Sequence, residues 1–355
     1  MQNSESYLYI SKQLTDWYEI NKRDLPWRKT TDSYLIWISE IILQQTRVNQ
    51  GMDYYLRFIE RFPTVIELAK AHEDEVLKYW QGLGYYSRAR NLYKAAQQIV
   101  TKFKGDFPKQ HGDVLQLSGI GDYTAAAICS LAYNQPYAVV DGNVYRVLSR
   151  IFGIKTPIDS GTGKKQFAKL AQNILSTAEP ATHNQALMEF GALQCVPSSP
   201  NCEICPLQSV CQAYETTEIS NLPVKLQKTK TTNRYFNYLF IKYNDFTFLQ
   251  KRTAKDVWQN LYEFPLIESD RLFDVSELIE NKDFQQLFSA IEKVEITNTT
   301  NPIKHILSHR VILAQFISVT ISESNKEFGK FTKVALNEID RYAVSRLMEL
   351  FLEKL

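Results

Sequence analysis

The stretch Cys195-Val-Pro-Ser-Ser-Pro-Asn-Cys202-Glu-Ile-Cys205-Pro-Leu-Gln-Ser-Val-Cys211 holds four of the five cysteines of the chain. Six, two and five residues separate them, so the four thiols are close enough in sequence to bind one metal group. Three short gaps with a proline after the third cysteine are typical of an iron–sulfur cubane. A single tetrahedral zinc ion is the main alternative, although zinc sites usually show two Cys-x2-Cys pairs.

Two disulfides within this stretch are the remaining interpretation. Disulfides need an oxidising compartment, but no signal peptide precedes Tyr7, and the fifth cysteine, Cys129, would stay unpaired. The spacing therefore predicts a [4Fe-4S] cluster with four cysteine ligands. We expect this loop to separate a catalytic unit before it from a second unit after it.

The composition is that of a protein with two ordinary domains. A chain of 355 residues corresponds to about two domains, and 44% apolar residues can form two cores. No apolar run is long enough to span a bilayer, so we expect a soluble, cytoplasmic protein without a membrane partner. The net charge of +2 does not indicate a nucleic-acid partner, so DNA binding has to be inferred from local motifs.

Apolar residues recur at three- and four-residue spacing from residue 4 to about 213, which predicts helices almost throughout. The helix expected at residues 34 to about 48 is apolar on nearly every face and should be buried. Glu40 lies in its middle, where an ionised carboxylate is costly, so its pKa should be raised and its acid form populated near neutrality. The alternative is a glutamate at the rim, or one paired with Arg28 or Arg47.

A glycine-containing turn, Leu-Gln-Leu-Ser-Gly-Ile-Gly-Asp-Tyr-Thr-Ala at residues 115–125, opens onto an alanine-rich helix. Backbone N–H groups at Gly119 and Gly121, together with the positive end of the helix dipole, can bind an anion such as a DNA phosphate. By itself a Gly-x-Gly pattern is a weak signal, because many tight turns share it.

Asp141, in the sequence Val-Asp-Gly-Asn-Val-Tyr-Arg, stands where a helix should begin. An N-cap aspartate accepts hydrogen bonds from backbone N–H groups, which should keep it ionised, and capping alone is the simpler interpretation. Taken together, however, Glu40 and Asp141 offer one acid and one anion. Hydrolysis of an N-glycosidic bond requires such a pair, because the leaving base is protonated while a carboxylate stabilises the oxocarbenium-like sugar.

From residue 25 to 211 the chain resembles the MutY-type adenine DNA glycosylases, members of the helix–hairpin–helix base-excision superfamily. The resemblance rests on the 115–125 turn, the cysteine loop and four further motifs: Leu-Pro-Trp-Arg, Ser-Glu-Ile-Ile-Leu-Gln-Gln-Thr-Arg-Val, Gly-Leu-Gly-Tyr-Tyr-Ser-Arg and Val-Asp-Gly-Asn-Val-Tyr-Arg-Val-Leu-Ser-Arg. It implies an all-α catalytic region of a monomeric enzyme. Such an enzyme removes adenine mispaired with 8-oxoguanine or guanine from double-stranded DNA, by base flipping and hydrolysis without a lyase step.

The resemblance also implies roles for individual residues. Glu40 would protonate the adenine and Asp141 would stabilise the cationic sugar, with support from Tyr123 and Asn143. The pocket for the flipped base would be lined by Trp27, Arg28, Leu43 and Val48. The residues that meet 8-oxoguanine in the base stack would be Gln45, Thr46, Leu83 and Tyr85. In the family the hairpin also tends to hold a cation on its backbone carbonyls, which adds a cation to the cofactors that the resemblance allows.

Related activities fit the sequence less well. Bifunctional endonuclease III enzymes carry a lysine nucleophile where this chain has Tyr123, which argues against a Schiff-base step. Mismatch thymine glycosylases share the tyrosine and the aspartate but lack the glutamate that is found here as Glu40. Excision of mismatched thymine or oxidised pyrimidine is the alternative activity. A DNA-binding protein without catalysis and an electron carrier are alternatives of other classes.

The part of the chain after the cysteine loop differs in pattern. A helical unit of residues 1–213 should be followed by a polar linker at 214–232 and then by an α+β unit at 233–355. Two strands of a hairpin, a further strand and a closing helix are expected at 235–241, 246–249, 311–321 and 335–352. The α+β unit resembles the Nudix-like recognition domain of the same family. The metal motif of true Nudix hydrolases is absent from the sequence, so pyrophosphatase activity is not expected.

Residues 305–310, His-Ile-Leu-Ser-His-Arg, resemble the family loop whose central serine contacts 8-oxoguanine. The resemblance assigns this readout to Ser308 and His309, whereas a polar turn before a strand is the alternative interpretation. Residues 258–265, Trp-Gln-Asn-Leu-Tyr-Glu-Phe-Pro, resemble a second motif of the Nudix-like domain. In and just before this motif, Asp256 and Asn260 stand where glycines are common.

Overall fold

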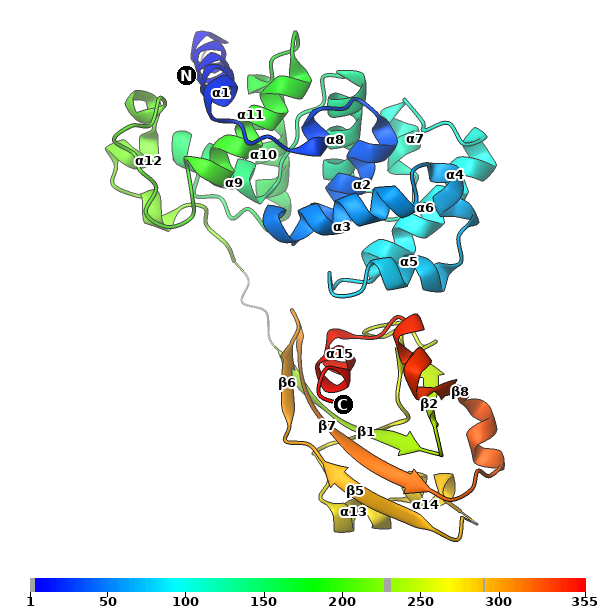
Figure 1. The fold of residues 1–355 in the computed structure, drawn as a ribbon. Helices are drawn as coiled ribbons and strands as arrows, with labels where there is room; N and C mark the ends of the chain where they lie inside the picture. Colours follow the sequence, from blue (N-terminus) through cyan, green and yellow to red (C-terminus); the bar gives the residue numbers. More distant parts are fainter. Residues whose placement is uncertain (1–3, 227–230, 290) are drawn as a thin grey trace. The chain divides into compact units, whose positions relative to one another are not determined.

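The computed structural model of the chain describes residues 4–226, 231–289 and 291–355. The N-terminal part is helical and the C-terminal part combines strands with helices (Figure 1), so the predicted fold class is confirmed. No helix among these residues is long and apolar enough to cross a membrane. The α-helices of the N-terminal part are α1 (Ser4–Asn21), α2 (Ser33–Leu43), α3 (Val48–Arg61), α4 (Val65–Lys70), α5 (Glu73–Tyr79), α6 (Ser87–Phe103), α7 (His111–Leu115), α8 (Asp122–Tyr133), α9 (Gly142–Ile151), α10 (Gly161–Ile174), α11 (Pro180–Leu193) and α12 (Gln212–Glu215).

A hydrophobic core forms where α1, α9, α10 and α11 meet. Leu14, Phe167 and Phe190 are among its fully buried members. The partly buried side chains of Cys195 and Cys205 pack against the same core. The cysteine loop is therefore fixed to two helices, α9 and α11, that also reach the pocket described below.

The single helix expected at residues 34 to about 48 is wrong, because the chain breaks there into two helices. Helix α2 ends at Leu43 and α3 begins at Val48. Gln45, between them, has a φ of +59°, a left-handed conformation that an α-helix cannot contain. The break places residues 44–47 in a turn at the end of the buried helix.

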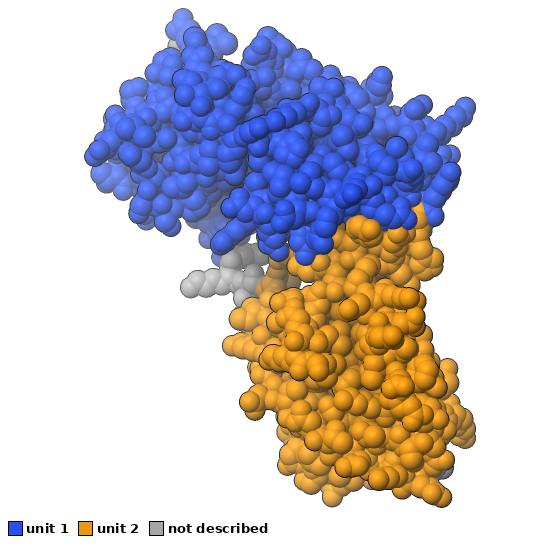
Figure 2. Space-filling view, in the orientation of Figure 1, with its two compact units in different colours: residues 1–70, 91–227 blue, residues 71–90, 228–355 orange. Residues whose placement is uncertain are grey.

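The described residues form two compact units, which Figure 2 shows in different colours. One unit consists of residues 1–70 and 91–227, and the other of residues 71–90 and 228–355. The segment 71–90 contains α5 and joins the C-terminal unit through long-range hydrogen bonds. The amide of Asn260 donates to Glu73 at 3.0 Å, and that of Gln81 donates to Glu349 at 2.5 Å.

This grouping differs from the uninterrupted units expected at 1–213 and 233–355. Residues 214–226, expected to be linker, belong to the helical unit, where Leu222 is buried and the Ile158 N–H donates to the Val224 carbonyl at 3.0 Å. Residues 227–230 of the expected linker lie outside the described residues.

The described residues of the C-terminal unit form two sheets. Besides α5, its strands and α-helices are β1 (Thr232–Lys242), β2 (Phe246–Lys251), β3 (Tyr262–Glu263), β4 (Leu266–Ser269), α13 (Val275–Glu280), α14 (Lys282–Leu287), β5 (Val294–Thr299), β6 (Ile303–Ile306), β7 (Arg310–Ile321), β8 (Thr332–Ala335) and α15 (Arg346–Leu352). The larger sheet has the order β4-β1-β7-β5, with β6 also paired to β7, and β1 runs parallel to β7. The smaller sheet has the order β3-β2-β8.

Alternation along β1 directs side chains to both faces of the larger sheet. Leu239 belongs to a core with Phe284 of α14 on one face. On the other face Phe240 packs against Phe351 of α15, with ring centroids 5.4 Å apart. Figure 1 shows α15 and the α13–α14 pair on opposite sides of the sheet.

Two expected elements of this unit are wrong in detail. The strands β1 and β2 are joined by a turn closed by a bridge between Tyr243 and Phe246, but they belong to different sheets. The closing helix expected at 335–352 is interrupted. A 3-10 turn spans Leu336–Arg341, and α15 begins only at Arg346, where the Ser345 hydroxyl caps it.

Candidate active site

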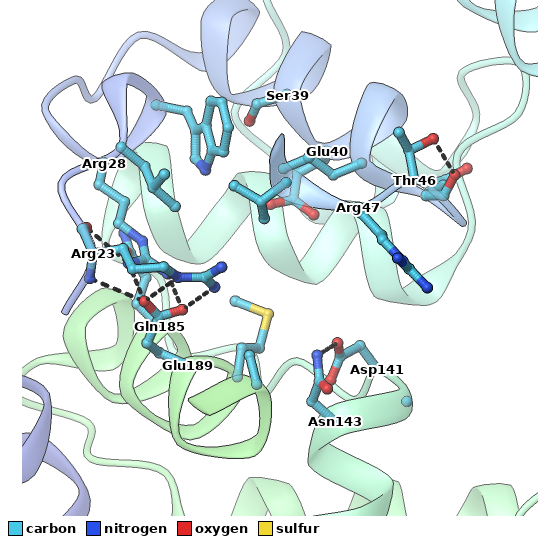
Figure 3. A pocket seen from close by; sticks show the side chains of 18 of the residues that line it. Arg23, Arg28, Ser39, Glu40, Thr46, Arg47, Asp141, Asn143, Gln185 and Glu189 are labelled. Carbon is cyan, nitrogen blue, oxygen red and sulfur yellow. Dashed lines mark hydrogen bonds and ion pairs between the residues drawn. The ribbon is translucent and has the colours of Figure 1, made fainter. Parts of the chain in front are cut away.

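A pocket of about 1160 Å³ lies in the helical unit. Its walls come from residues 23–28, α2, the turn that follows α2, the start of α3, residues of α8 and α9, and one side of α11 (Figure 3). The structure brings together in this pocket all four residues predicted to be catalytic, all four predicted to hold the flipped base, and two of those predicted to meet 8-oxoguanine: Glu40, Asp141, Tyr123, Asn143, Trp27, Arg28, Leu43, Val48, Gln45 and Thr46.

Glu40 reaches the pocket from α2 and is 9% exposed. Burial raises the pKa of its carboxyl to about 7, although a hydrogen bond from the Tyr123 hydroxyl, 2.7 Å from Oε2, acts in the opposite direction. The pKa shift predicted from the apolar neighbours in sequence is therefore confirmed. Arg28, a candidate partner, instead directs its guanidinium to Glu189 at 2.8 and 2.7 Å.

Asp141 faces the same pocket from the start of α9, where it is the N-cap residue. Its Oδ1 accepts a hydrogen bond from the Val144 N–H at 2.8 Å, and its Oδ2 accepts one from the Asn143 amide at 2.8 Å. Burial nevertheless raises the pKa of Asp141, while these donors lower it. The donors expected from the N-cap position are present, but burial, which the sequence did not indicate, shifts the pKa in the opposite direction.

The two carboxyl groups influence each other's protonation. The charge of Asp141 is one of the causes that raise the pKa of Glu40. Asp141 accepts hydrogen bonds from a backbone N–H and a side-chain amide, whereas Glu40 accepts one from a phenol. When two carboxyl groups share a site, the one with more donors ionises first and favours the acid form of the other. The pocket can therefore hold an acid, Glu40, opposite an anion, Asp141.

The sequence did not reveal one wall of the pocket, a buried ion-pair group around Glu189 of α11. Its carboxylate is 1% exposed and accepts hydrogen bonds from Arg23 and Arg28 (Figure 3). Although burial raises the pKa of Glu189, these hydrogen bonds lower it to about 2. Nearby, Gln185 lines the pocket and accepts a hydrogen bond from the Tyr18 hydroxyl at 2.6 Å. The detectable signal was Glu189 itself, a charge between Met188 and Phe190 in an apolar helix.

Two arginines of α9 tie the pocket to the cysteine loop. Arg146 donates to the Cys195 carbonyl at 2.7 Å and to Oδ1 of Asn143 at 2.9 Å, so one side chain links the loop to the residue that supports Asp141. Arg150 donates to the carbonyl of Val196 at 2.8 Å and to the Cys195 sulfur at 3.4 Å. Movement of the loop would therefore displace Arg146 and Asn143, and through Asn143 it would change the position of Asp141.

The four predicted ligands Cys195, Cys202, Cys205 and Cys211 line one small cavity in the same unit. No group of three or more His, Cys, Asp or Glu side chains in the residues that the structure describes is preassembled around a metal-ion position. The thiols nevertheless surround one space, and Arg150 holds the loop that carries them. Their type and placement fit an iron–sulfur group.

The predicted hairpin is present between α7 and α8. Gly119 has a φ of +77°, and a Cβ atom there would lie 2.5 Å from the Cβ of Asn91, so both conformation and space require glycine. Gly121 is the N-cap of α8. Phosphate and cation binding at this hairpin stay predictions.

The remaining residues predicted to recognise 8-oxoguanine lie in the C-terminal unit. Leu83 and Tyr85 belong to the segment 71–90, and Ser308 and His309 to the turn between β6 and β7. Leu83 is 8% exposed, whereas Tyr85 is 53% exposed. The Tyr85 hydroxyl lies 2.9 Å from Oγ of Ser308.

Three family models match consecutive parts of the chain. The HhH-GPD superfamily base excision DNA repair protein model matches residues 38–174. The iron-sulfur binding domain of endonuclease III matches 195–211, which are the residues from the first to the fourth cysteine of the loop. The NUDIX domain model matches 237–354.

Two solved structures share the fold of part of the chain. A thermostable thymine-DNA glycosylase is 28% identical with a TM-score of 0.57, and the match covers 61% of this chain and 100% of that one. Endonuclease III in a non-covalent DNA complex is 21% identical with a TM-score of 0.53, over 61% of this chain and 99% of that one, which is a likeness of fold alone.

Some curated relatives match nearly the whole chain, and others match part of it. Adenine DNA glycosylase of Buchnera aphidicola subsp. Baizongia pistaciae is 35% identical over 89% of this chain and 87% of its own length. The enzyme of the same name from Buchnera aphidicola subsp. Acyrthosiphon pisum is 36% identical over 91% of both chains. That of Homo sapiens is 41% identical over 59% of this chain and 40% of its own. With the order of the three family models, this near-full-length similarity shows that the chain belongs to the family of adenine DNA glycosylases.

Proposed function

We propose that this chain is a monofunctional adenine DNA glycosylase that removes adenine mispaired with 8-oxoguanine or guanine in base-excision repair. The observation that carries the proposal is the pairing of two carboxyl groups in one pocket. Glu40 has its pKa raised to about 7, and Asp141 is held by a backbone N–H and an amide. N-glycosidic hydrolysis requires both an acid and an anion.

The reaction begins with the target adenine flipped out of the duplex into the pocket. Protonated Glu40 donates its proton to N7 of the adenine, and the C1′–N9 bond breaks with its electron pair moving to the base. The carboxylate of Asp141 stabilises the positive charge on the sugar. A water molecule then adds to C1′ and gives its proton to Glu40, which restores the acid.

Several neighbours would support this chemistry without reacting. Tyr123 holds Oε2 of Glu40 by its 2.7 Å hydrogen bond, and Asn143 holds Oδ2 of Asp141. Trp27, Leu43 and Val48 supply apolar surface for the base. Arg28, held by Glu189, forms a fixed charged wall beside them. Fixed polar groups of this kind favour a charged transition state because they need no reorganisation.

Readout of the opposite base is proposed for the residues that the sequence indicated: Gln45, Thr46, Leu83, Tyr85, Ser308 and His309. Gln45 and Thr46 border the pocket, and the Ser308 hydroxyl can donate a hydrogen bond. Gly119 and Gly121 would bind a backbone phosphate at the start of α8, where a cation on the hairpin carbonyls is also proposed.

A [4Fe-4S] cluster held by Cys195, Cys202, Cys205 and Cys211 is proposed as the resident cofactor. When bound, it would cross-link four thiolates of one loop. Arg146 and Arg150 then hold that loop against α9 through the Cys195 and Val196 carbonyls. Iron analysis tests this assignment. About four iron atoms per chain with visible charge-transfer absorption are expected, and stoichiometric zinc without such absorption would contradict it.

The activity is tested with four duplexes that differ at one position. They contain a single A:8-oxoguanine, A:G, T:G or thymine-glycol site, and base release is followed in single turnovers. We expect adenine release from the first two and none from the others. Faster release of thymine or thymine glycol than of adenine would replace the proposal by the alternative glycosylase activity. Release of no base would refute catalysis.

A further inference from the structure

The hairpin that carries Ser308 has a short, exposed tip. Strands β6 and β7 are joined by residues 307–309, and the Leu307 N–H donates to the Arg310 carbonyl at 2.8 Å. Ser308 and His309 are exposed at this tip. So short a turn has little packing of its own, so its direction depends on the hydrogen bond between Ser308 and Tyr85 and on what holds the two strands at its base.

Arg310, the first residue of β7, is held by Asp256. One carboxylate oxygen of Asp256 accepts a hydrogen bond from Arg310, and the other accepts one from Arg234 at 2.6 Å and one from Arg252 at 3.2 Å. Although burial raises the pKa of Asp256, the hydrogen bonds from Arg310 and Arg234 lower it to about 2. The carboxylate is therefore ionised at neutral pH and draws together strand β1, strand β7 and its own loop.

The same loop also contacts β6. Residues 252–261, here called the β2–β3 segment, include Trp258, whose ring lies 5.5 Å from that of His305 and 6.3 Å from that of Phe236. Trp258 is 8% exposed and has a φ of +60°, a conformation that is rare for a bulky residue. A strained backbone persists only where its surroundings determine it, so this turn is firmly held.

The β2–β3 segment contacts a third element, the segment 71–90 that carries Leu83 and Tyr85. Asn260, at a φ of +67°, donates its amide to Glu73 at 3.0 Å. The Gln259 carbonyl accepts a hydrogen bond from Arg90 at 2.8 Å. One loop of the C-terminal unit thus touches both elements proposed to read the opposite base there.

We propose that the β2–β3 segment positions this reader, with Asp256 as its principal positioning residue. The inference rests on the proposed function and deepens its 8-oxoguanine readout. Asp256 acts through Arg310 on the turn that presents Ser308. This positioning role also accounts for Asp256 and Asn260, which stand where glycines are common. Asp256 and Asn260 each supply a side-chain hydrogen bond that glycine cannot make.

The test compares two variants that each remove one carboxylate from the same arginine network. Asp256→Asn keeps the shape of the side chain but loses the charge that holds Arg310. Glu268→Gln is the control, because Glu268 pairs with Arg234 at 2.6 Å from strand β4, whereas the contacts to Arg310 come from Asp256. The readout is the ratio of single-turnover adenine release from A:8-oxoguanine and A:G duplexes, together with the melting temperature of each variant.

We expect Asp256→Asn to lower that ratio by on the order of tenfold. A Ser308 hydroxyl that is out of place would contribute little to the recognition of 8-oxoguanine. The rate on A:G should change little, and Glu268→Gln should retain the wild-type ratio. Arg310→Gln breaks the same contact from the other side, so it is informative even if Asp256→Asn folds poorly. Combined with Asp256→Asn, it should add little further loss.

Hydrogen exchange gives a readout that does not depend on activity. The amides of residues 305–310 should exchange faster in Asp256→Asn than in Glu268→Gln. Unchanged preference and unchanged exchange in both Asp256→Asn and Arg310→Gln would overturn the inference while leaving the proposed function intact. A wild-type protein that does not release adenine, or that treats the two duplexes alike, would instead refute the proposed function on which the inference rests.

Discussion

The hydroxyl of Tyr85 and the hydroxyl of Ser308 lie 2.9 Å apart and share a hydrogen bond, although 223 residues of sequence separate them. Both residues were predicted to recognise 8-oxoguanine, one from the helical unit and one from the C-terminal unit. The segment 71–90 brings Tyr85 into the C-terminal unit, so the two hydroxyls meet within one compact body. The hydrogen bond helps to orient both hydroxyl groups in the protein without DNA.

Tyr85→Phe tests whether this hydrogen bond prepares the reader. Loss of one hydroxyl partner should lower the preference for A:8-oxoguanine over A:G by about 0.5–1.5 kcal/mol, because Ser308 is then free to rotate. Single-turnover rates on the two duplexes measure the effect, with Tyr9→Phe, an exposed tyrosine of α1, as the matched control. A stronger preference in Tyr85→Phe would mean that the Tyr85 hydroxyl competes with the lesion for Ser308.

Glu40→Gln should abolish adenine release while leaving DNA binding nearly unchanged. The amide keeps the size of the side chain but has no acidic proton to give to N7 of the base. We expect a loss of at least about 10²-fold in the single-turnover rate. Glu60→Gln, which alters an exposed glutamate of α3, is the control. Residual release within tenfold of the wild-type rate would remove Glu40 from the mechanism.

The protonation of Glu40 predicts a pH dependence of both rate and stability. Because the acid form is needed, adenine release should decline as the pH rises through about 7, the pKa of Glu40 in the native state. Between 4.5 and about 7 the carboxyl group of Glu40 binds more protons in the native state than in the unfolded chain. The contribution of Glu40 to the free energy of unfolding should therefore fall as the pH rises through this window, by on the order of 3 kcal/mol.

Denaturant unfolding of wild type and Glu40→Gln isolates this contribution. Below pH 4.5 the contribution of Glu40 to the free energy of unfolding of the wild type is fully present, and above about pH 7 that contribution is lost. The difference in unfolding free energy between the two proteins should therefore change across the window, since all other titrating groups are common to both. An equal difference on both sides of the window would show that Glu40 does not titrate there.

Glu189→Gln should destabilise the protein strongly. The carboxylate is 1% exposed, and its removal leaves the guanidinium groups of Arg23 and Arg28 without their counter-charge. Breaking a buried ion pair from one side typically costs about 3–5 kcal/mol. Glu19→Gln is the control, because its pair with Lys22 is solvent-exposed and should contribute less than about 1 kcal/mol. Similar melting temperatures for the two variants would contradict this role of Glu189.

The sequence was most informative where the cause of a property is local. The raised pKa of Glu40 follows from apolar residues on its own helix, and the position of Asp141 follows from its N-cap. The upward direction of the pKa shift of Asp141 was not predicted. It depends on burial by other elements, which no neighbouring residue in sequence indicates.

Features that join distant parts of the chain could not be predicted. Arg23 and Glu189 are 166 residues apart, and nothing in the charged run that contains Arg23 distinguishes it from a solvated surface. The break after Leu43 was missed because the sequence stays compatible with a helix, while Gln45 adopts a left-handed conformation there. The membership of the segment 71–90 in the C-terminal unit likewise depends on contacts across most of the chain.

That membership has a consequence for how the protein is made. The segment 71–90 leaves the ribosome long before its partners, since Glu73 and Asn260 are separated by 187 residues and Gln81 and Glu349 by 268. Closing contacts over such distances is slow, and domains otherwise fold in the order of their synthesis. The segment 71–90 therefore lacks these partners until helix α15 has been translated. A chain truncated before the C-terminal unit therefore loses more than that unit's strands and helices. Residues 71–90 are also left without the partners that they contact in the full chain.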